Sequence, residues 1–356
     1  MIRTSADVSL QALERYDALI DVRSPGEFAA DHLPGAINLP VLDDAQRAEV
    51  GTIYVQRSKF LARRLGASLV ARNIADHLEG RLADRDGAFR PLVYCWRGGQ
   101  RSTAMAVVMG QVGWPVTQLQ GGYQAWRRHV VSRLYEPDEQ ILNLVLLDGL
   151  TGSGKTAVLS RLGARGVQSL DLEALAAHRG SLFGATAVAQ PSQKLFETRL
   201  VDALDRLDPA RPIVVEAESS KIGRLTLPPT IWSAMKAAPR IQLTAPLASR
   251  VQMVLQDYAA FELDPGARDD ALRRLPSHHS RETVAAWRKL SQDGDIAGLA
   301  TALMIHHYDP AYRRASRANV REIGLIALSG GGSAELDRAA DVVKTHVNNI
   351  DADITV

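Results

Sequence analysis

The feature that most restricts the fold of this chain is GLTGSGKT, Gly149–Thr156, which follows the continuous apolar run ILNLVLLD. It has the spacing G-x-x-x-x-G-K-[ST], and a helical pattern, AVLSRLGA, comes directly after it. In such a strand–loop–helix unit the backbone N–H groups surround a diphosphate, the lysine adds positive charge and the hydroxyl can coordinate Mg²⁺. We therefore expect a phosphate-binding loop (P-loop) with these ligands: Gly149, Thr151, Gly152, Ser153, Gly154, Lys155 and Thr156.

Acidic residues follow two further strand candidates. The run PIVVEAES ends in Glu216 and Glu218, where a Walker B strand usually ends in aspartate, and VQSLDL places Asp171 after another strand. Ligands of open α/β sheets bind at the carboxyl ends of the strands. Each carboxylate could therefore bind a metal such as Mg²⁺ or act as a base. Each could equally cap the segment that follows it.

The first half of the chain contains a second loop between a strand and a helix. The apolar run PLVYCW leads into RGGQRS, with Cys95 at the junction. Backbone N–H groups that converge there would lower the pKa of a thiol and make it a better nucleophile. We expect Cys95 to be the nucleophile and Arg101 to face an anion carried on the sulfur. The intervening residues form the anion cradle: Trp96, Arg97, Gly98, Gly99 and Gln100.

Strand patterns alternate with helical patterns along both halves, which favours an α/β fold with parallel sheets. We expect an N-terminal parallel-sheet domain over residues 1–135 and a P-loop NTPase-like α/β domain over residues 140–356. The polar segment Leu134–Gln140 is the linker candidate, and residues from about 257 to 312 read as a helical insertion.

The chain has one cysteine, no apolar signal segment at its start and no apolar run of the roughly 20 residues that cross a bilayer. These features favour a cytoplasmic protein without a membrane partner. The net charge of +2 does not indicate nucleic-acid binding by itself. Basic residues are nevertheless clustered in separate parts of the chain. Each cluster could contact the phosphate backbone of an RNA or could form a solvated helix face. The candidates are Arg63, Arg64, Arg273 and Arg274.

Four segments of the first half resemble the rhodanese family in order and spacing. They are DVRSPGEF, HLPGAINLP, the Cys95 loop and LQGGYQAW. The resemblance implies transfer of sulfur, or of selenium, as an adduct on Cys95. The spacing from Cys95 to Arg101 is one residue longer than in the common sulfurtransferase loop and matches phosphatase relatives, so phosphatase chemistry stays open. Asp21 and Arg23 are expected to hold the fold together.

Across nearly its whole length the chain resembles the bacterial tRNA 2-selenouridine synthases. The segments that carry this resemblance are EVGTIYVQRSKF, YCWRGGQRS, GLTGSGKT, LDLEALAAHRGSLFG, QPSQKLFE, VVEAESSKIG and HHYDPAY. One departure is Ser220, where the family often has arginine. The resemblance implies a tRNA partner with 2-thiouridine at the wobble position of its anticodon. Geranyl diphosphate would alkylate the sulfur, and selenophosphate would then supply selenium as the S-geranyl group leaves.

Other functions are compatible with the same motifs. In an ATP-dependent tRNA sulfurtransferase the P-loop would hydrolyse ATP to activate the base. A non-catalytic RNA-binding protein would use the P-loop as a nucleotide switch, although the Cys95 loop argues against that. A phosphatase–kinase fusion is the third alternative. The P-loop ligand, geranyl diphosphate or a nucleotide such as ATP, is left open by the sequence.

Overall fold

The computed structural model describes residues 2–136, 142–181, 183–257, 265–275, 279–315 and 321–354. The chain packs as two units. Unit 1 comprises Met1–Glu136 with Pro191–Arg206, and unit 2 comprises Pro137–Gln190 with Leu207–Val356. This division differs from the domains expected from sequence in the segment 191–206, which packs within unit 1. The linker candidate begins inside a helix that continues to Tyr135, and its residues 137–140 lie outside the described ones.

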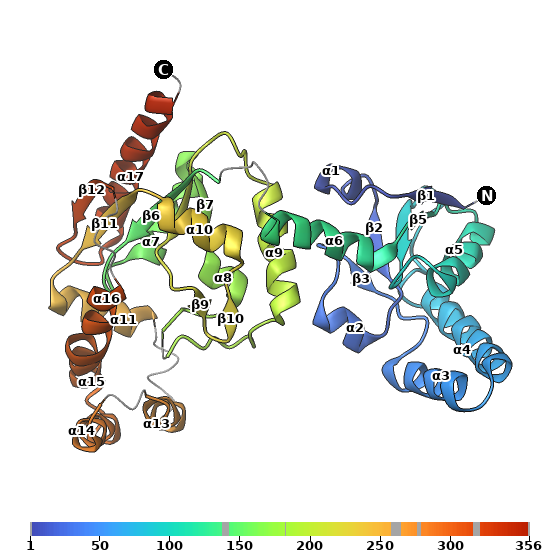
Figure 1. The fold of residues 1–356 in the computed structure, drawn as a ribbon, viewed down its shortest axis with the longest axis horizontal. Helices are drawn as coiled ribbons and strands as arrows, with labels where there is room; N and C mark the ends of the chain where they lie inside the picture. Colours follow the sequence, from blue (N-terminus) through green and yellow to red (C-terminus); the bar gives the residue numbers. More distant parts are fainter. Residues whose placement is uncertain are drawn as a thin grey trace. The chain divides into compact units, whose positions relative to one another are not determined.

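Unit 1 is a five-stranded parallel sheet with helices around it (Figure 1). The strand order is β1-β5-β4-β2-β3, and a core that includes Ile20, Val93 and Met105 is fully buried. β1 was not expected from sequence. The elements are β1 (Arg3–Ser5), α1 (Leu10–Leu13), β2 (Ala18–Asp21), α2 (Pro25–Ala30), β3 (Ile37–Asn38), α3 (Asp44–Gln56), α4 (Lys59–Glu79), β4 (Pro91–Tyr94), α5 (Gln100–Val112), β5 (Thr117–Leu119), α6 (Gly122–Tyr135) and α9 (Gln193–Asp205).

Helix α9 belongs to unit 1 because it packs against α6. Its buried residues include Leu195, Phe196 and Leu200, and polar side chains join the two helices. The indole N–H of Trp126 donates to Thr198 Oγ1 at 3.0 Å, and Arg127 forms an ion pair with Glu197. These partners are about 70 residues apart in sequence. No local pattern could assign α9 to the first unit.

Unit 2 is a second five-stranded parallel sheet, with order β12-β11-β6-β8-β7, and a separate antiparallel hairpin of β9 and β10. The elements are β6 (Leu144–Asp148), α7 (Lys155–Leu162), the 3-10 turn η1 (Gly163–Arg165), β7 (Gln168–Leu170), α8 (Leu172–Ala176), β8 (Ile213–Glu216), β9 (Lys221–Ile222), β10 (Leu225–Thr226), α10 (Pro229–Ala237), β11 (Arg240–Thr244), α11 (Leu247–Asp257), α13 (Pro265–Arg273), α14 (Arg281–Gln292), α15 (Ile296–Leu303), the π-helix η2 (Met304–Tyr308), α16 (Asp309–Ala315), β12 (Glu322–Ala327) and α17 (Ser333–Ile354).

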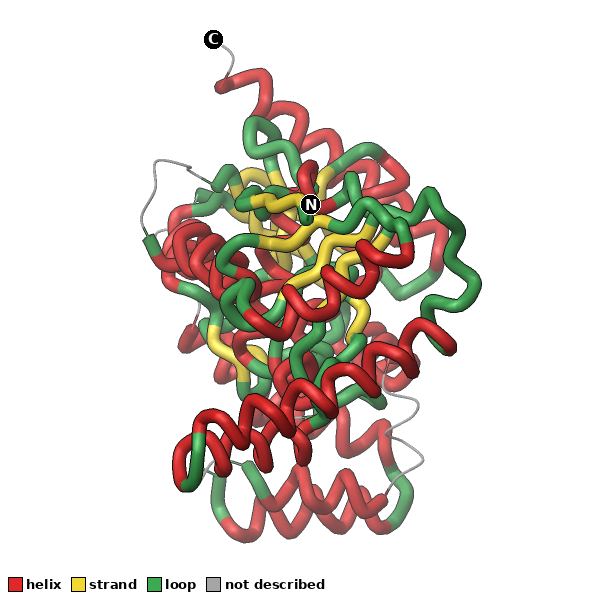
Figure 2. The backbone as a smooth tube through the Cα atoms, turned by 90° about the vertical axis from the view of Figure 1, so that its right-hand side faces the viewer, coloured by secondary structure: helices red, strands yellow, loops and turns green. Residues whose placement is uncertain are grey.

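The helices from α13 to α16 form the helical region that the sequence predicted between β11 and β12, and they gather at one end of unit 2 (Figure 1). The last helix, α17, ends beside the C-terminus (Figure 2). No helix of the described residues is both long and apolar enough to cross a membrane. The two parallel sheets confirm the predicted α/β fold class.

Candidate functional site

In unit 1 the Cys95 loop, Cys95–Arg101, connects the end of β4 to the start of α5. The thiol is buried, and its sulfur accepts a hydrogen bond from the Gly99 N–H at 3.2 Å and another from the Ser102 hydroxyl at 3.2 Å. Burial raises the pKa of Cys95, but the hydrogen bonds from Ser102, Gly99 and Arg97 outweigh it and hold the pKa below its ordinary value. The loop therefore favours the thiolate form of Cys95, and its role as nucleophile stays a prediction.

Two glycines let the segment 119–122 support this loop at close range. Gly122 has φ +54°, and a Cβ there would lie 2.2 Å from the Cys95 carbonyl oxygen. Gly98 has φ +69°, and its Cβ would lie 2.6 Å from the Leu119 carbonyl oxygen. A side chain at either position would push the two segments apart. The LQGGYQAW segment thus acts by holding the Cys95 loop in shape.

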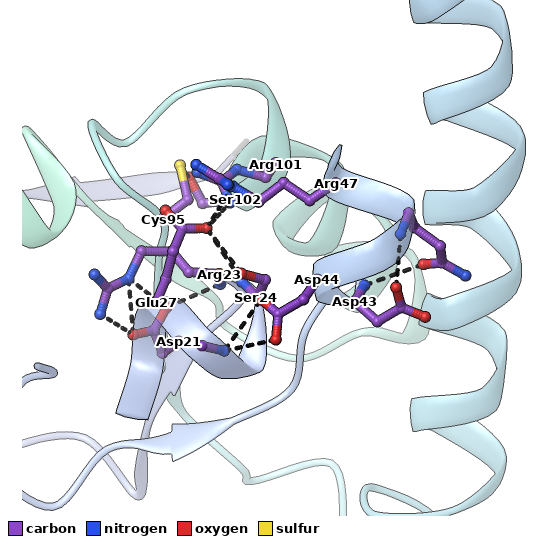
Figure 3. A network of polar contacts seen from close by, with 12 residues as sticks. Asp21, Arg23, Ser24, Glu27, Asp43, Asp44, Arg47, Cys95, Arg101 and Ser102 are labelled. Atoms are coloured by element: carbon purple, nitrogen blue, oxygen red, sulfur yellow. Dashed lines mark hydrogen bonds and ion pairs between the residues drawn. The ribbon is translucent and has the colours of Figure 1, made fainter. Parts of the chain in front are cut away.

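Arg101 of the same loop donates to the Glu27 carboxylate at 2.7 Å (Figure 3). Arg47 reaches the same oxygen of Glu27 at 3.0 Å. Although burial raises the pKa of Glu27, the two guanidinium groups lower it below its ordinary value. Glu27 therefore stays ionised and orients both cations. A direct catalytic role for Arg101 stays a prediction.

Asp21 and Arg23 form a buried ion pair with Nη2 and Oδ2 2.5 Å apart. The Arg23 guanidinium lies 4.0 Å from the centre of the Tyr123 ring, and that ring packs against Trp96 with 5.1 Å between centroids. Neither charged group is accessible to a substrate. This burial is consistent with the prediction that Asp21 and Arg23 hold the fold together. Of the remaining loop residues, Arg97 is exposed and donates to Gln124, and Gln100 begins α5.

In unit 2 the P-loop connects β6 to α7, with Lys155 as the first residue of the helix. Gly149, Gly152 and Gly154 have φ values of +155°, +79° and +82°. The Lys155 ammonium donates to the Gly149 carbonyl at 2.7 Å, across the loop. Backbone N–H groups and a cation therefore lie together at a helix N-terminus, an arrangement suited to a diphosphate.

Side chains from the helical region hold the P-loop in place. The Tyr312 hydroxyl accepts a hydrogen bond from the Gly149 N–H at 3.1 Å. The buried Arg250 of α11 donates to the Thr151 carbonyl at 3.2 Å and forms a bidentate ion pair with Asp309 at 2.9 and 2.8 Å. Asp309 and Tyr312 both belong to the segment HHYDPAY. That motif thus serves the P-loop, a role the sequence did not indicate.

Three carboxylates converge near the P-loop. Oxygens of Glu173, Glu216 and Glu218 lie within 4.8 Å of one another, and Glu216 Oε1 is buried without a hydrogen-bond partner in the described part of the chain. Burial, together with the nearby Glu218, raises the pKa of Glu216 to about 7 despite the proximity of Lys155. Burial also raises the pKa of Glu173 and Glu218. Acids that repel each other and keep a free oxygen are suited to a divalent cation.

The structure places Asp171 differently from the two glutamates predicted with it. Its side chain caps α8 and accepts a hydrogen bond from the Ala174 N–H at 2.8 Å. Glu173, the second residue of the same helix, contributes the third carboxylate instead. The stretch DLE, Asp171–Glu173, was expected to end the strand near a ligand, but only Asp171 was predicted as a metal ligand or base. In the motif LDLEALAAH, the second acid was the available signal.

The comparisons with known proteins agree with this geometry. A family model described as tRNA 2-selenouridine synthase AAA domain matches residues 142–269, and a rhodanese-like domain model matches residues 5–129. The tRNA 2-selenouridine synthase of Pseudomonas fluorescens is 38% identical over 349 residues, which cover 90% of this chain and 93% of that protein. The chain belongs to the tRNA 2-selenouridine synthase family.

Two further members of the family match over a shorter segment. The protein from Cupriavidus pinatubonensis is 38% identical over 248 residues, covering 67% of this chain, and the protein from Cupriavidus necator is 40% identical over 248 residues, covering 68% of this chain. The chain spans 65% of the length of each of these two relatives. The chain itself has a rhodanese-like unit followed by a P-loop unit.

Proposed function

We propose that this chain converts 2-thiouridine of tRNA into 2-selenouridine, with geranyl diphosphate and selenophosphate as co-substrates. The observation that carries the proposal is the presence of two separate anion sites in a chain that is similar to one tRNA 2-selenouridine synthase over 90% of its length. One site stabilises a thiolate on Cys95, and the other pairs a P-loop with a cluster of three acids. Two sites suit a reaction in two steps.

The P-loop unit is suited to the alkylation step. The 2-thio sulfur forms a bond to C1 of the geranyl group, the bond from C1 to oxygen breaks, and diphosphate leaves with the electron pair while the base loses its N3 proton. Lys155 and the loop N–H groups stabilise the charge that grows on the departing diphosphate. Glu216 and Glu218 would hold a magnesium ion, which would neutralise further phosphate charge.

The Cys95 loop is suited to the selenium step. Selenium of selenophosphate attacks C2 of the alkylated base, and the geranyl thiolate leaves. Water then cleaves the selenium–phosphorus bond and releases phosphate. Alkylation is useful here because it converts a thiocarbonyl, a poor leaving group, into a thiolate that departs readily. The Cys95 loop would hold the selenium donor beside the base.

The turn between α3 and α4 is the best-supported tRNA surface in unit 1. Phe60 is 70% exposed and Tyr54 is 43% exposed, so two aromatic rings face solvent where splayed bases could stack on them. The surrounding cations are exposed and have no carboxylate partner in the part of the chain that the structure describes. They are Arg57, Lys59, Arg63 and Arg64.

The other candidate surface, on α13 of unit 2, is already neutralised in part. Arg273 forms an ion pair with Asp269 at 2.8 Å, and Arg288 shares that carboxylate. Arg274 is exposed. We therefore assign the larger share of phosphate contacts to the α3–α4 turn, with Arg273 and Arg274 as a secondary contact.

Mass spectrometry of nucleosides from bulk tRNA, in a selenium-fed strain with and without the gene, tests this function. We expect 2-selenouridine to disappear on deletion and 2-thiouridine to persist. A plasmid copy should restore 2-selenouridine. Loss of 2-thiouridine itself would instead support the ATP-dependent sulfurtransferase. Unchanged nucleosides would leave only a binding role.

A further inference from the structure

An apolar pocket opens beside the P-loop within unit 2. It encloses about 570 Å³ of empty space, part of it open to solvent. Its lining surface is almost entirely apolar. The walls come from α11, α15, η2 and the P-loop, through residues that include Val254, Leu299, Ala300, Leu303, Met304 and Thr151.

The P-loop forms one rim of this pocket. Thr151 lines it directly, and its carbonyl is held by Arg250 of α11. Gly152 packs so closely on the same helix that a Cβ would lie 2.6 Å from the Arg250 carbonyl oxygen and 3.0 Å from Val254 Cγ2. Val254 is itself a pocket residue. A ligand with its phosphates in the P-loop would therefore have the pocket next to its ester oxygen.

The inner wall of the pocket is backed by a packed core. Leu299 and Leu303 line the pocket and also form a buried cluster with Leu272 and Trp287. A close-packed wall of this kind cannot recede to admit polar groups with their water. The wall therefore fixes the apolar character of the pocket.

This apolar character selects the ligand. The ribose and base of a nucleotide carry polar atoms, and burying them against carbon leaves their hydrogen bonds unmade. A hydrocarbon chain has no such requirement. We propose that the pocket binds the chain of an alkyl diphosphate whose diphosphate occupies the P-loop. This proposal rests on the proposed function and extends it, because it makes the helical region the part of the protein that distinguishes a prenyl chain from a nucleotide.

Direct binding measurements on the full chain test the proposal without tRNA or selenium. Isothermal titration with Mg²⁺ present would compare geranyl diphosphate, dimethylallyl diphosphate, inorganic diphosphate and ATP. Because each buried methylene favours binding about fourfold, geranyl diphosphate should bind roughly 100-fold or more tightly than inorganic diphosphate, with dimethylallyl diphosphate between them. Equal affinity for geranyl and inorganic diphosphate, or tighter binding of ATP than of geranyl diphosphate, would overturn the proposal.

Two substitutions on α15 form a matched pair. Ala300→Phe fills the pocket and should weaken geranyl diphosphate about tenfold or more while leaving inorganic diphosphate unchanged. Ala297→Phe adds the same ring on the exposed side of the helix and should change neither. If Ala300→Phe does not fold, Ile296→Asn at the pocket wall serves instead, with the same expectation. A folded pocket variant that keeps wild-type affinity for geranyl diphosphate would contradict the proposal.

The two proposals fail in different ways. Pocket-dependent binding of geranyl diphosphate without alkylation of tRNA would refute the function and leave the pocket assignment standing. Alkylation of tRNA with an unchanged KM for geranyl diphosphate in Ala300→Phe would refute the pocket and leave the function standing.

Discussion

The Cys95 loop and the P-loop have similar backbone geometry, but the ionisable groups at the two sites have pKa values shifted in opposite directions. Each joins a parallel strand to a helix N-terminus, and each contains glycines with positive φ, Gly98 in one and Gly152 and Gly154 in the other. In the Cys95 loop, hydrogen-bond donors point at one sulfur and lower its pKa. Beside the P-loop, acids point at one another and their pKa values rise. The first site stabilises its own negative charge, whereas the second disfavours negative charge and is suited to a cation.

The largest effect should come from Lys155→Ala, because the P-loop then loses its charged phosphate ligand. Removing a charge-assisted contact costs roughly 1.5–3 kcal/mol, or about ten- to a hundredfold or more in affinity for geranyl diphosphate. Titration calorimetry measures the affinity, and a geranylation assay on 2-thiouridine tRNA measures the transfer. Tight binding of geranyl diphosphate by the variant would place that ligand outside the P-loop.

Substitution of Glu216 tests the claim that the acid cluster is unstable without a cation. The folded-state pKa is raised from 4.5 to about 7, so wild-type stability should fall as pH rises through this interval in the absence of metal. Glu216→Gln removes that loss and should be more stable above pH 7 by up to about 3 kcal/mol. Urea unfolding at pH 5 and pH 8 in EDTA measures the difference.

With magnesium at pH 8, the wild type should become more stable to urea than Glu216→Gln, because the ion stabilises the wild-type cluster more than the variant. Glu322→Gln, which changes an exposed glutamate at the start of β12, is the matched control and should show neither effect. If the free energy of unfolding changed equally with pH in wild type and Glu216→Gln, ionisation of Glu216 would not destabilise the folded protein.

The opposite shift at Cys95 depends on Ser102. Ser102→Ala removes the hydroxyl that donates to the sulfur at 3.2 Å and should raise the pKa of the thiol. The rate of alkylation by iodoacetamide against pH reports this pKa, and its midpoint should move to higher pH in the variant. Thr103→Val, on the next residue of α5, removes a hydroxyl that bonds the Gly99 carbonyl and should move the midpoint less. An unmoved midpoint in both variants would assign the shift to the backbone alone.

The smallest effects should come from the basic surfaces of the two units. Arg63→Glu with Arg64→Glu should weaken tRNA binding and flatten its salt dependence by about one unit of slope for each lost phosphate contact. Arg273→Glu with Arg274→Glu should do the same to a lesser degree, since Asp269 already pairs with Arg273. Fluorescence anisotropy across a salt series measures both. A larger change from the α13 pair would move the main tRNA contact to unit 2.

Local chemistry was readable from the sequence, and long-range packing was not. The P-loop and the Cys95 loop are contiguous, so strand, glycines and reactive residue appear in order. Glu173 joins Glu216 and Glu218 only because β7 and β8 are adjacent in the sheet. The apolar pocket likewise combines the P-loop with residues from α11 and α15, which lie about 100 to 150 residues further along the chain. Contacts of that kind leave no local pattern.

A crossover assay tests the division of labour between the two loops most directly. Cys95→Ser and Lys155→Ala would each be given two substrates: 2-thiouridine tRNA with geranyl diphosphate, and S-geranylated tRNA with selenophosphate. Mass spectrometry would quantify the nucleosides. We predict that Cys95→Ser forms S-geranyl-2-thiouridine but no 2-selenouridine, and that Lys155→Ala forms 2-selenouridine from the geranylated tRNA but cannot make that tRNA. A folded Cys95→Ser protein that loses geranylation, or a folded Lys155→Ala protein that loses the selenium step, would contradict the account.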